Sequence, residues 1–167
     1  MHGYILDTSV LSAHLDPLHA KHRDIRAAIE ALDPGSAQFV SAVSLAELTF
    51  GVRMSEAFGH HALPTLRQML VEARAYAVLD VTHHTSAVYA ELKTNLAQRY
   101  LAKAARQYRS RWLEEWVDKA SGQKLQVDEN DLWMCAQAKE RELILVTADR
   151  RMNRIAEADA EVRLLVL

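Results

Sequence analysis

Short apolar runs, each followed by a segment with helical periodicity, recur along this chain of 167 residues. Runs such as YIL, QFV and LILVT have the length of buried strands, and helical patterns separate them. This alternation favours strand–helix–strand crossovers and a parallel sheet that helices cover on both faces. We predict an α/β fold, one domain over residues 1–167, with a central, mainly parallel sheet of four to five short strands flanked by helices.

The composition limits the classes of function. A net charge of −2 gives no overall attraction for nucleic acids, so binding of RNA or DNA requires a locally basic surface. The single cysteine, Cys135, excludes an internal disulfide and fits a reducing compartment. No apolar stretch reaches the length of a membrane span, and the N-terminus has no signal-peptide pattern. We expect a cytoplasmic protein that does not bind membranes.

Four acidic residues lie in apolar surroundings, where a carboxylate is unfavourable without a partner. Asp7 directly follows the run YIL, and Asp149 comes two residues after LILVT. Glu47 lies within SLAEL, and Asp131 opens the helical run DLWMCAQA. Sites in parallel sheets form at the carboxyl ends of the strands. We therefore expect the four acids to converge at one sheet edge, with at least three carboxylates within reach of one ion.

Each acid alone has a simpler explanation. Asp7 and Asp131 can cap helices, Glu47 can complete a capping box with Ser44, and Asp149 can be an ordinary turn residue. Four converging acids, however, repel one another unless cations neutralise them. Oxygen ligands favour Mg²⁺ or Mn²⁺ over zinc. The set is therefore a candidate metal site.

The sequence around these acids resembles the four acidic motifs of the PIN-domain ribonucleases. The motifs are YILDTSVL, SAVSLAEL, NDLWMCAQA and LILVTADRRM, in this order and over nearly the whole chain. They look most like the toxins of bacterial toxin–antitoxin pairs called VapC. The resemblance implies a single PIN-like domain that hydrolyses RNA phosphodiester bonds with Mg²⁺ or Mn²⁺, a small antitoxin as partner, and a homodimer. It implies this catalytic and metal-binding set: Asp7, Glu47, Asp131 and Asp149.

In this chemistry a metal ion lowers the pKa of a bound water, and the resulting hydroxide attacks phosphorus. Asp7 and Asp131 are the strongest candidate ligands, while Asp149 ligates directly or through water. Glu47 either ligates or orients the attacking water. Three neutral neighbours can orient these acids or contact the scissile phosphate: Ser9, Asn130 and Thr147. Six basic residues are candidate RNA contacts: Arg150, Arg151, Arg154, Arg99, Lys103 and Arg106.

The helical pattern continues from Thr85 to about Ser121, and a helical insertion around 101–124 is longer than the family pattern leads us to expect. Its aromatic residues follow a helical stripe, with basic residues on the other side. We expect the aromatic stripe to be buried: Tyr108, Trp112 and Trp116. We expect the basic face to be exposed, either merely solvated or tracking RNA phosphates: Arg99, Lys103 and Arg106.

Two other functions fit parts of the sequence. A haloacid-dehalogenase-type phosphotransferase also begins with Asp after its first strand, but it needs a second Asp two residues later, where this chain has Ser9. A non-catalytic PIN-like module that binds RNA or protein is the other alternative. Loss of an acid would favour it, and all four acids are present.

Overall fold

The computed structural model describes residues 3–167, in which five strands form one sheet of order β3-β2-β1-β4-β5. The strands are β1 (Tyr4–Leu6), β2 (Gln38–Ser41), β3 (Ala77–Leu79), β4 (Ile144–Thr147) and β5 (Arg163–Val166). All pairings between neighbouring strands are parallel. The predicted α/β fold with a central parallel sheet is therefore confirmed, and β1 is its middle strand.

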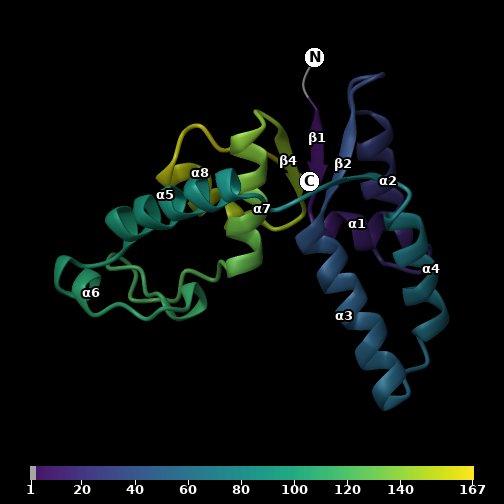
Figure 1. Cartoon of the computed structure of the whole chain (residues 1–167), viewed down its shortest axis with the longest axis horizontal. Coiled ribbons are helices and arrows are strands. Elements are labelled where there is room, and N and C mark those ends of the chain that lie inside the picture. Colours follow the sequence, from purple (N-terminus) through teal and green to yellow (C-terminus); the bar gives the residue numbers. More distant parts are fainter. Residues whose placement is uncertain (1–2) are drawn as a thin grey trace.

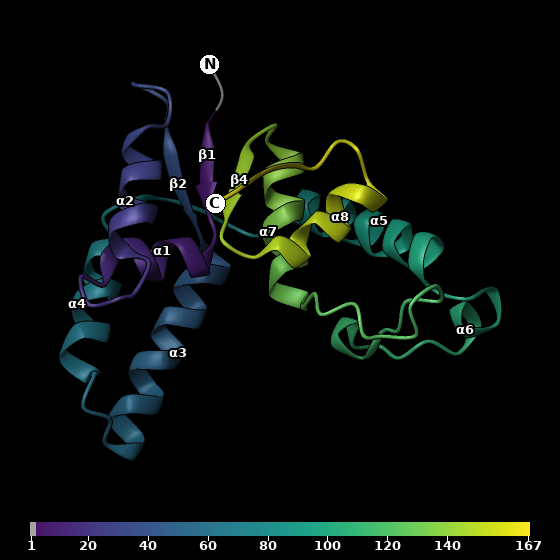
Figure 2. The ribbon, with the colours of Figure 1, turned by 180° about the vertical axis from the view of Figure 1, so that it is seen from behind.

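Helices cover both sides of this sheet (Figures 1 and 2). One side carries α1 (Thr8–Leu15), α2 (His22–Glu30), α3 (Ala42–Phe58) and α4 (Leu63–Ala73). The other side carries α5 (His83–Tyr100), α7 (Glu129–Glu140) and α8 (Asn153–Ala158). Among the helices of residues 3–167, we find none that combines the length and the apolarity needed to cross a membrane.

The central strand contributes to both hydrophobic cores. Ile5 packs in the core under α5 and α7, whereas Tyr4 and Leu6 pack in the core under α1 and α4. Ile5 and Leu6 are completely buried, because both faces of the strand are covered. The apolar run therefore ends inside the protein, and the next residue, Asp7, begins in the same buried environment.

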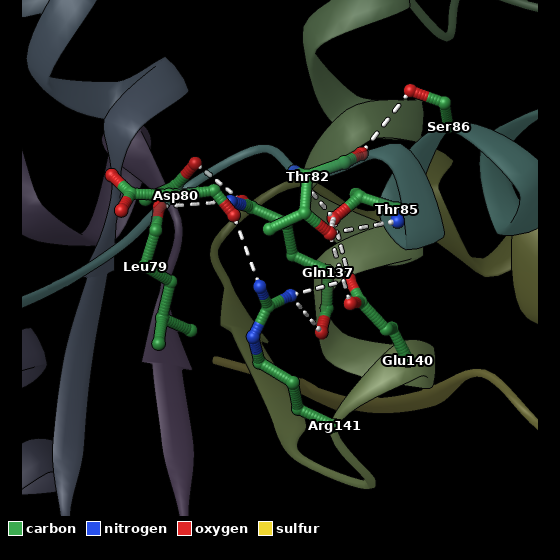
Figure 3. A network of polar contacts seen from close by, with 9 residues as sticks. Leu79, Asp80, Thr82, Thr85, Ser86, Gln137, Glu140 and Arg141 are labelled. Carbon is green, nitrogen blue, oxygen red and sulfur yellow. Dashed lines mark hydrogen bonds and ion pairs between the residues drawn. The ribbon is translucent and has the colours of Figure 1, made fainter.

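A buried polar network fixes α7 against the sheet (Figure 3). The completely buried Gln137 donates to the Leu79 carbonyl at 2.9 Å and accepts from the Ser41 hydroxyl at 2.5 Å. Nearby, the Arg141 guanidinium donates to the Asp80 carbonyl at 3.0 Å, and the Thr85 hydroxyl donates to Glu140 at 2.5 Å. These bonds join the C-terminal half of α7 to β2, β3 and α5. They therefore fix the position of α7, whose first turn contains Asp131.

The prediction of one long helix through residues 101–124 is wrong. Helix α5 ends at Tyr100, and only α6 (Lys103–Gln107) and a 3₁₀ turn, η1 (Leu113–Glu115), follow before an isolated bridge between Val117 and Lys124. Figures 1 and 2 show this 101–124 segment extending away from the sheet beyond α5. Buried side chains anchor it to the core, and its backbone follows them rather than the helical pattern: Leu101, Leu113 and Trp116.

The predicted burial of the aromatic stripe is correct only for Trp116, which is 2% exposed. Tyr108 is 84% exposed and Trp112 is 55% exposed, because the loop turns both rings away from the core. On the basic face, Arg99 and Lys103 are exposed as expected, whereas Arg106 is half-buried. The segment is thus an anchored loop with an outward-facing aromatic surface.

Candidate active site

Asp7 lies at the carboxyl end of β1 and is only 3% exposed. Its Oδ2 accepts hydrogen bonds from the hydroxyls of Ser9 and Thr147, both at 2.7 Å. Asp7 occupies the N-cap position of α1, yet within the described chain its side chain makes no capping hydrogen bond. Helix capping therefore does not explain this buried carboxylate, which two hydroxyl groups orient at the edge of the sheet.

Asp131 lies in the first turn of α7 and forms a reciprocal capping box with Asp128. Asp128 Oδ1 accepts from the Asp131 backbone N–H at 2.9 Å, and Asp131 Oδ2 accepts from the Asp128 N–H at 3.1 Å. The capping explanation for Asp131 is thus confirmed, but the N-cap itself is Asp128. Burial raises the pKa of Asp131 to about 7, and the charges of Asp128, Asp7 and Asp149 act in the same direction.

Asp128 was not among the predicted site residues, although the sequence contains a signal for it. Two Asp residues stand three positions apart in DEND, directly before an apolar helical run. An N-cap and a partner at the third helical position have this spacing in a capping box. Asp128 therefore adds a further carboxylate beside Asp131.

Asp149 follows β4 and caps a 3₁₀ turn, η2 (Arg150–Met152), by accepting from the Arg151 N–H at 2.9 Å. The Arg151 guanidinium holds the same carboxylate, with Nε 2.8 Å from Oδ1 and Nη2 2.5 Å from Oδ2. These hydrogen bonds from Arg151 hold the pKa of Asp149 below its ordinary value. Asp149 is therefore an ionised carboxylate whose charge one arginine partly neutralises.

Glu47 links three helices. Its Oε2 accepts from the Thr8 hydroxyl of α1, and its Oε1 accepts from Asn130 Nδ2 of α7 at 2.8 Å. The alternative of a capping box with Ser44 is wrong, because the N-cap of α3 is Ser41, whose side chain accepts from the helix backbone. Glu47 is thus held by side chains that neighbour Asp7 and Asp131 along the chain.

The structure brings three of the predicted acids into one electrostatic environment. The charges of Asp7 and Asp149 both raise the pKa of Asp131, whereas Glu47 is joined to the group by hydrogen bonds. Such a gathering of carboxylates at low exposure is unfavourable without a positive charge. Asp7 and Asp149 thus follow the carboxyl ends of β1 and β4, and Asp131 lies close enough for both charges to act on it.

The expectation that three carboxylates lie within reach of one ion is not met. Across residues 3–167, no three His, Cys, Asp or Glu side chains are grouped closely enough to hold a metal ion. Two acids are held by protein donors instead, Asp149 by Arg151 and Glu47 by its two hydrogen bonds. The donor set still fits Mg²⁺ or Mn²⁺, because it consists of oxygens and because burial, and after it the neighbouring negative charges, raise the pKa of Asp131, and a bound cation would offset both.

A cleft of about 370 Å³ opens on Asp131 and Asp149 and not on Asp7 or Glu47. Its lining mixes acidic and basic side chains: Asp128, Asp131, Asp149, Lys124 and Arg151. Asp149 and Arg151 also border a second hollow of about 440 Å³, which contains Ser9 and Lys21. Basic side chains therefore lie on both sides of the acids, an arrangement suited to an anionic polymer.

The three arginines that follow Asp149 have different contacts. Arg151 binds Asp149, and Arg150 is exposed on η2. Arg154 lies over the Tyr100 ring, 5.6 Å from its centroid, with Nη1 4.0 Å from an Asp118 oxygen. Arg151 is therefore the one of these three that lines both the cleft and the second hollow.

The other three predicted RNA contacts do not line the acidic cleft. Arg99 lies near the end of α5, and Lys103 and Arg106 lie in α6, within the 101–124 segment. Arg99 forms an ion pair with Glu157 at 3.7 Å. Arg106 donates to the Gln98 carbonyl at 2.5 Å, and Lys103 is exposed on α6. They form a surface separate from the acidic cleft.

Comparison with known proteins identifies the family and the fold. A family model of the PIN domain matches residues 4–158. The fold is similar to VapBC2 from Rickettsia felis bound to a promoter DNA fragment, with 21% identity, a TM-score of 0.67, and 98% of this chain and 97% of that chain covered. No curated protein gives a significant match.

Two further solved structures share the fold. VapBC-5 from Mycobacterium tuberculosis, a member of the VapBC family of toxin–antitoxin systems, has 25% identity, a TM-score of 0.62 and 100% of both chains covered. VapBC-1 from nontypeable Haemophilus influenzae has 17% identity, a TM-score of 0.64, and 98% of this chain and 96% of that chain covered. The family model covers the sheet strands β1 to β4 and all four acidic residues. The chain belongs to the PIN domain family.

Proposed function

We propose that this protein is a metal-dependent endoribonuclease that hydrolyses RNA phosphodiester bonds as the toxin of a toxin–antitoxin pair. The observation that carries the proposal is the buried Asp7 at the end of β1, held by Ser9 and Thr147, with Asp149 after β4 and with Asp131 nearby, where burial and then neighbouring charges raise its pKa to about 7. A bound Mg²⁺ or Mn²⁺ supplies charge neutralisation at the phosphate and lowers the pKa of nearby water.

Each residue of the chain has a separate part in this proposal. Asp7 and Asp131 would hold the cation, and Ser9 and Thr147 orient Asp7 through their hydroxyls. Asp149, which Arg151 holds, would join them only by releasing that guanidinium, which then becomes free for a phosphate oxygen.

Glu47 orients the attacking water in this proposal. Its carboxylate is fixed by hydrogen bonds from Thr8 and Asn130, one residue along the chain from Asp7 and Asp131 respectively. A carboxylate held in this way accepts a proton from water in a defined direction. In a phosphotransferase of the haloacid-dehalogenase type an acid stands two residues after Asp7, whereas here the hydroxyl of Ser9 donates to Asp7.

Cleavage of a fluorescent RNA by the purified protein tests the enzymatic part. We expect fragments to accumulate with Mg²⁺ or Mn²⁺, to cease with EDTA and to return when the metal is added back. Equal cleavage in EDTA would contradict the metal dependence. Binding of the RNA without cleavage under all metal conditions would favour the non-catalytic PIN-like module.

A groove beside the acids supports an antitoxin partner. The groove has a volume of about 580 Å³ and an apolar lining that includes Val43, Phe50 and Trp133, and it opens on Glu47 and Asn130. Phe50 is 65% exposed, which is a large apolar surface next to an acid. This chemistry matches a partner segment with apolar side chains and one basic side chain that reaches the acids.

We further propose that the protein forms a homodimer.

Growth of bacteria that express the isolated chain tests the toxin role. We expect wild-type protein to arrest growth and the Asp24→Asn variant, altered at an exposed acid of α2, to do the same. The Asp7→Asn variant at equal expression should allow growth, because its acidic site is incomplete. Normal growth with active wild-type enzyme would exclude the toxin role.

A further inference from the structure

The 101–124 segment exposes two large aromatic rings while other apolar side chains anchor it. Leu113 and Trp116 are 0% and 2% exposed and fix the loop to the core, and the Trp116 indole N–H donates to the Ser110 carbonyl at 2.8 Å. Tyr108 and Trp112, in the same loop, face solvent. Because the loop is already anchored, little conformational entropy is lost when a planar ligand binds to its exposed aromatic rings.

The same stretch is strongly basic. From Leu101 to Trp112 the chain has four basic residues and no acidic one, in a protein whose net charge is −2. Within residues 3–167, no ion pair involves any of these four: Lys103, Arg106, Arg109 and Arg111. Their charge is therefore available to an anionic ligand.

One of these guanidinium groups lies over an aromatic ring, and another binds the backbone of the segment. Arg111 lies over the Trp112 ring, 5.3 Å from its centroid. Arg109 donates to the Arg106 carbonyl at 2.7 Å, and the Arg106 Nε is buried without a hydrogen-bond partner. The guanidinium groups of Arg109 and Arg111, in contrast, are on exposed residues and can bind a phosphate oxygen.

These arginines line a cavity of about 670 Å³ between α5 and the 101–124 segment. Lys93 of α5 and Trp116 of the segment also line it, and the Lys93 charge is balanced by Glu129. The uncompensated charge in the cavity thus comes from Arg106, Arg109 and Arg111. Its volume lies within the range of ligand sites in proteins.

The segment also connects this surface to the acidic cleft. Glu114 and Lys124 line the cleft that contains Asp131 and Asp149. Figures 1 and 2 show the chain leaving α5, passing α6 and returning to the start of α7, where Asp131 lies. A polymer that follows the segment therefore reaches the acids.

We propose that the 101–124 segment is a binding surface for single-stranded RNA, which it leads to the acidic cleft. Tyr108 and Trp112 stack on unpaired bases, and the basic residues from Lys103 to Arg111 contact the phosphates. Single strands are selected because bases in a duplex are already stacked and offer no free face. The substrate class rests on the proposed ribonuclease function.

Binding of a fluorescein-labelled, unstructured RNA of about 20 nucleotides, measured by anisotropy in EDTA, tests this surface without cleavage. The Tyr108→Ala, Trp112→Ala double variant is expected to bind at least about tenfold more weakly than the wild type, with an unchanged salt dependence. The Phe58→Ala variant, which removes another exposed aromatic ring at the end of α3, should bind like the wild type.

The Arg109→Gln, Arg111→Gln double variant tests the interaction with phosphates. Its plot of log affinity against log salt should be less steep by about 0.7 for each phosphate that the variant no longer neutralises. The Arg23→Gln, Arg53→Gln variant, altered at exposed arginines of α2 and α3, should retain the wild-type slope. A duplex of the same sequence should compete weakly.

Three outcomes would overturn the proposal. They are no RNA binding by the wild type in EDTA, wild-type affinity in both segment variants, and a changed oligomeric state in light scattering with RNA affinity unchanged. The last would identify the segment as a protein interface. Because binding is measured without metal, the proposal stands if RNA binds here and is not cleaved, which would contradict only the ribonuclease function.

Discussion

The Asp7→Asn variant is expected to keep the wild-type fold and to cleave RNA at least about 1,000-fold more slowly than the wild type. Asn has nearly the shape of Asp, and its side-chain oxygen can still accept from Ser9 and Thr147, which hold Asp7 at 2.7 Å. The change removes the negative charge that would bind a cation. Initial rates on a fluorescent RNA with Mg²⁺ measure the loss.

Circular dichroism and the unfolding midpoint of the same samples separate loss of chemistry from loss of fold. The Asp24→Asn variant makes the same chemical change on an exposed face of α2 and should cleave at the wild-type rate. A folded Asp7→Asn protein with wild-type activity would mean that this buried carboxylate has no part in the reaction.

The Asp131→Asn variant is expected to be more stable than the wild type in the absence of metal, by about 2–4 kcal/mol at pH 8. Burial and three neighbouring acids raise the pKa of Asp131 from its ordinary value of 3.8 to about 7. Ionising this group in the folded protein is therefore unfavourable. The Asn side-chain oxygen can still accept from the Asp128 N–H, and the backbone N–H of residue 131 still donates to Asp128, so the capping box keeps both of its bonds.

The sign of the pH dependence follows from the raised pKa. Between pH 4 and 7 the folded protein binds more protons at Asp131 than the unfolded chain does, so wild-type stability falls as the pH rises through this interval. The advantage of the Asn variant should shrink to about 40% of its pH 8 value at pH 5. Urea unfolding at both pH values measures it, and a difference that is equal at pH 5 and 8 would contradict a raised pKa.

Mg²⁺ supplies a second check on this variant. A cation that binds only the folded wild type raises its stability by mass action, so the advantage of the Asn variant should decrease with added Mg²⁺. Exposed acids do not produce this effect at low Mg²⁺ concentration, because their charges are already screened.

The sheet and the gathering of the acids could be predicted because both depend on strong local patterns. YIL and LILVT are apolar over nearly their whole length, and only a strand covered on both faces accommodates such runs next to helices. Asp7 and Asp149 then follow from topology, since parallel strands end at the same edge.

The partners of the acids could not be predicted, since they depend on side-chain directions in short turns. Three arginines follow Asp149, and the sequence does not show which of them binds its carboxylate. In the structure the η2 turn directs Arg151 to that carboxylate, whereas Arg154 lies over the Tyr100 ring. The capping box of Asp131 with Asp128 could have been predicted from the spacing in DEND. The apolar run after Asp131, however, is the stronger pattern, and it draws attention to Asp131 rather than to Asp128.

The 101–124 segment was mispredicted because its helical periodicity is outweighed by tertiary contacts. Leu101 is extended and buried, which ends α5, and the Lys119 N–H then donates to the Tyr100 carbonyl at 2.8 Å to close the loop. Once the backbone follows these anchors, Tyr108 and Trp112 no longer share a face with Trp116.

The central claim, that the acids at the carboxyl edge of the sheet bind a divalent cation, is tested most directly by Mn²⁺ binding. Electron paramagnetic resonance reports free Mn²⁺ during a titration of the wild type and of the Asp7→Asn, Asp131→Asn and Asp24→Asn variants. We predict that the wild type and Asp24→Asn bind Mn²⁺ with the same affinity, and that each of the other two binds at least about tenfold more weakly. Equal Mn²⁺ affinity in all four proteins would contradict the claim.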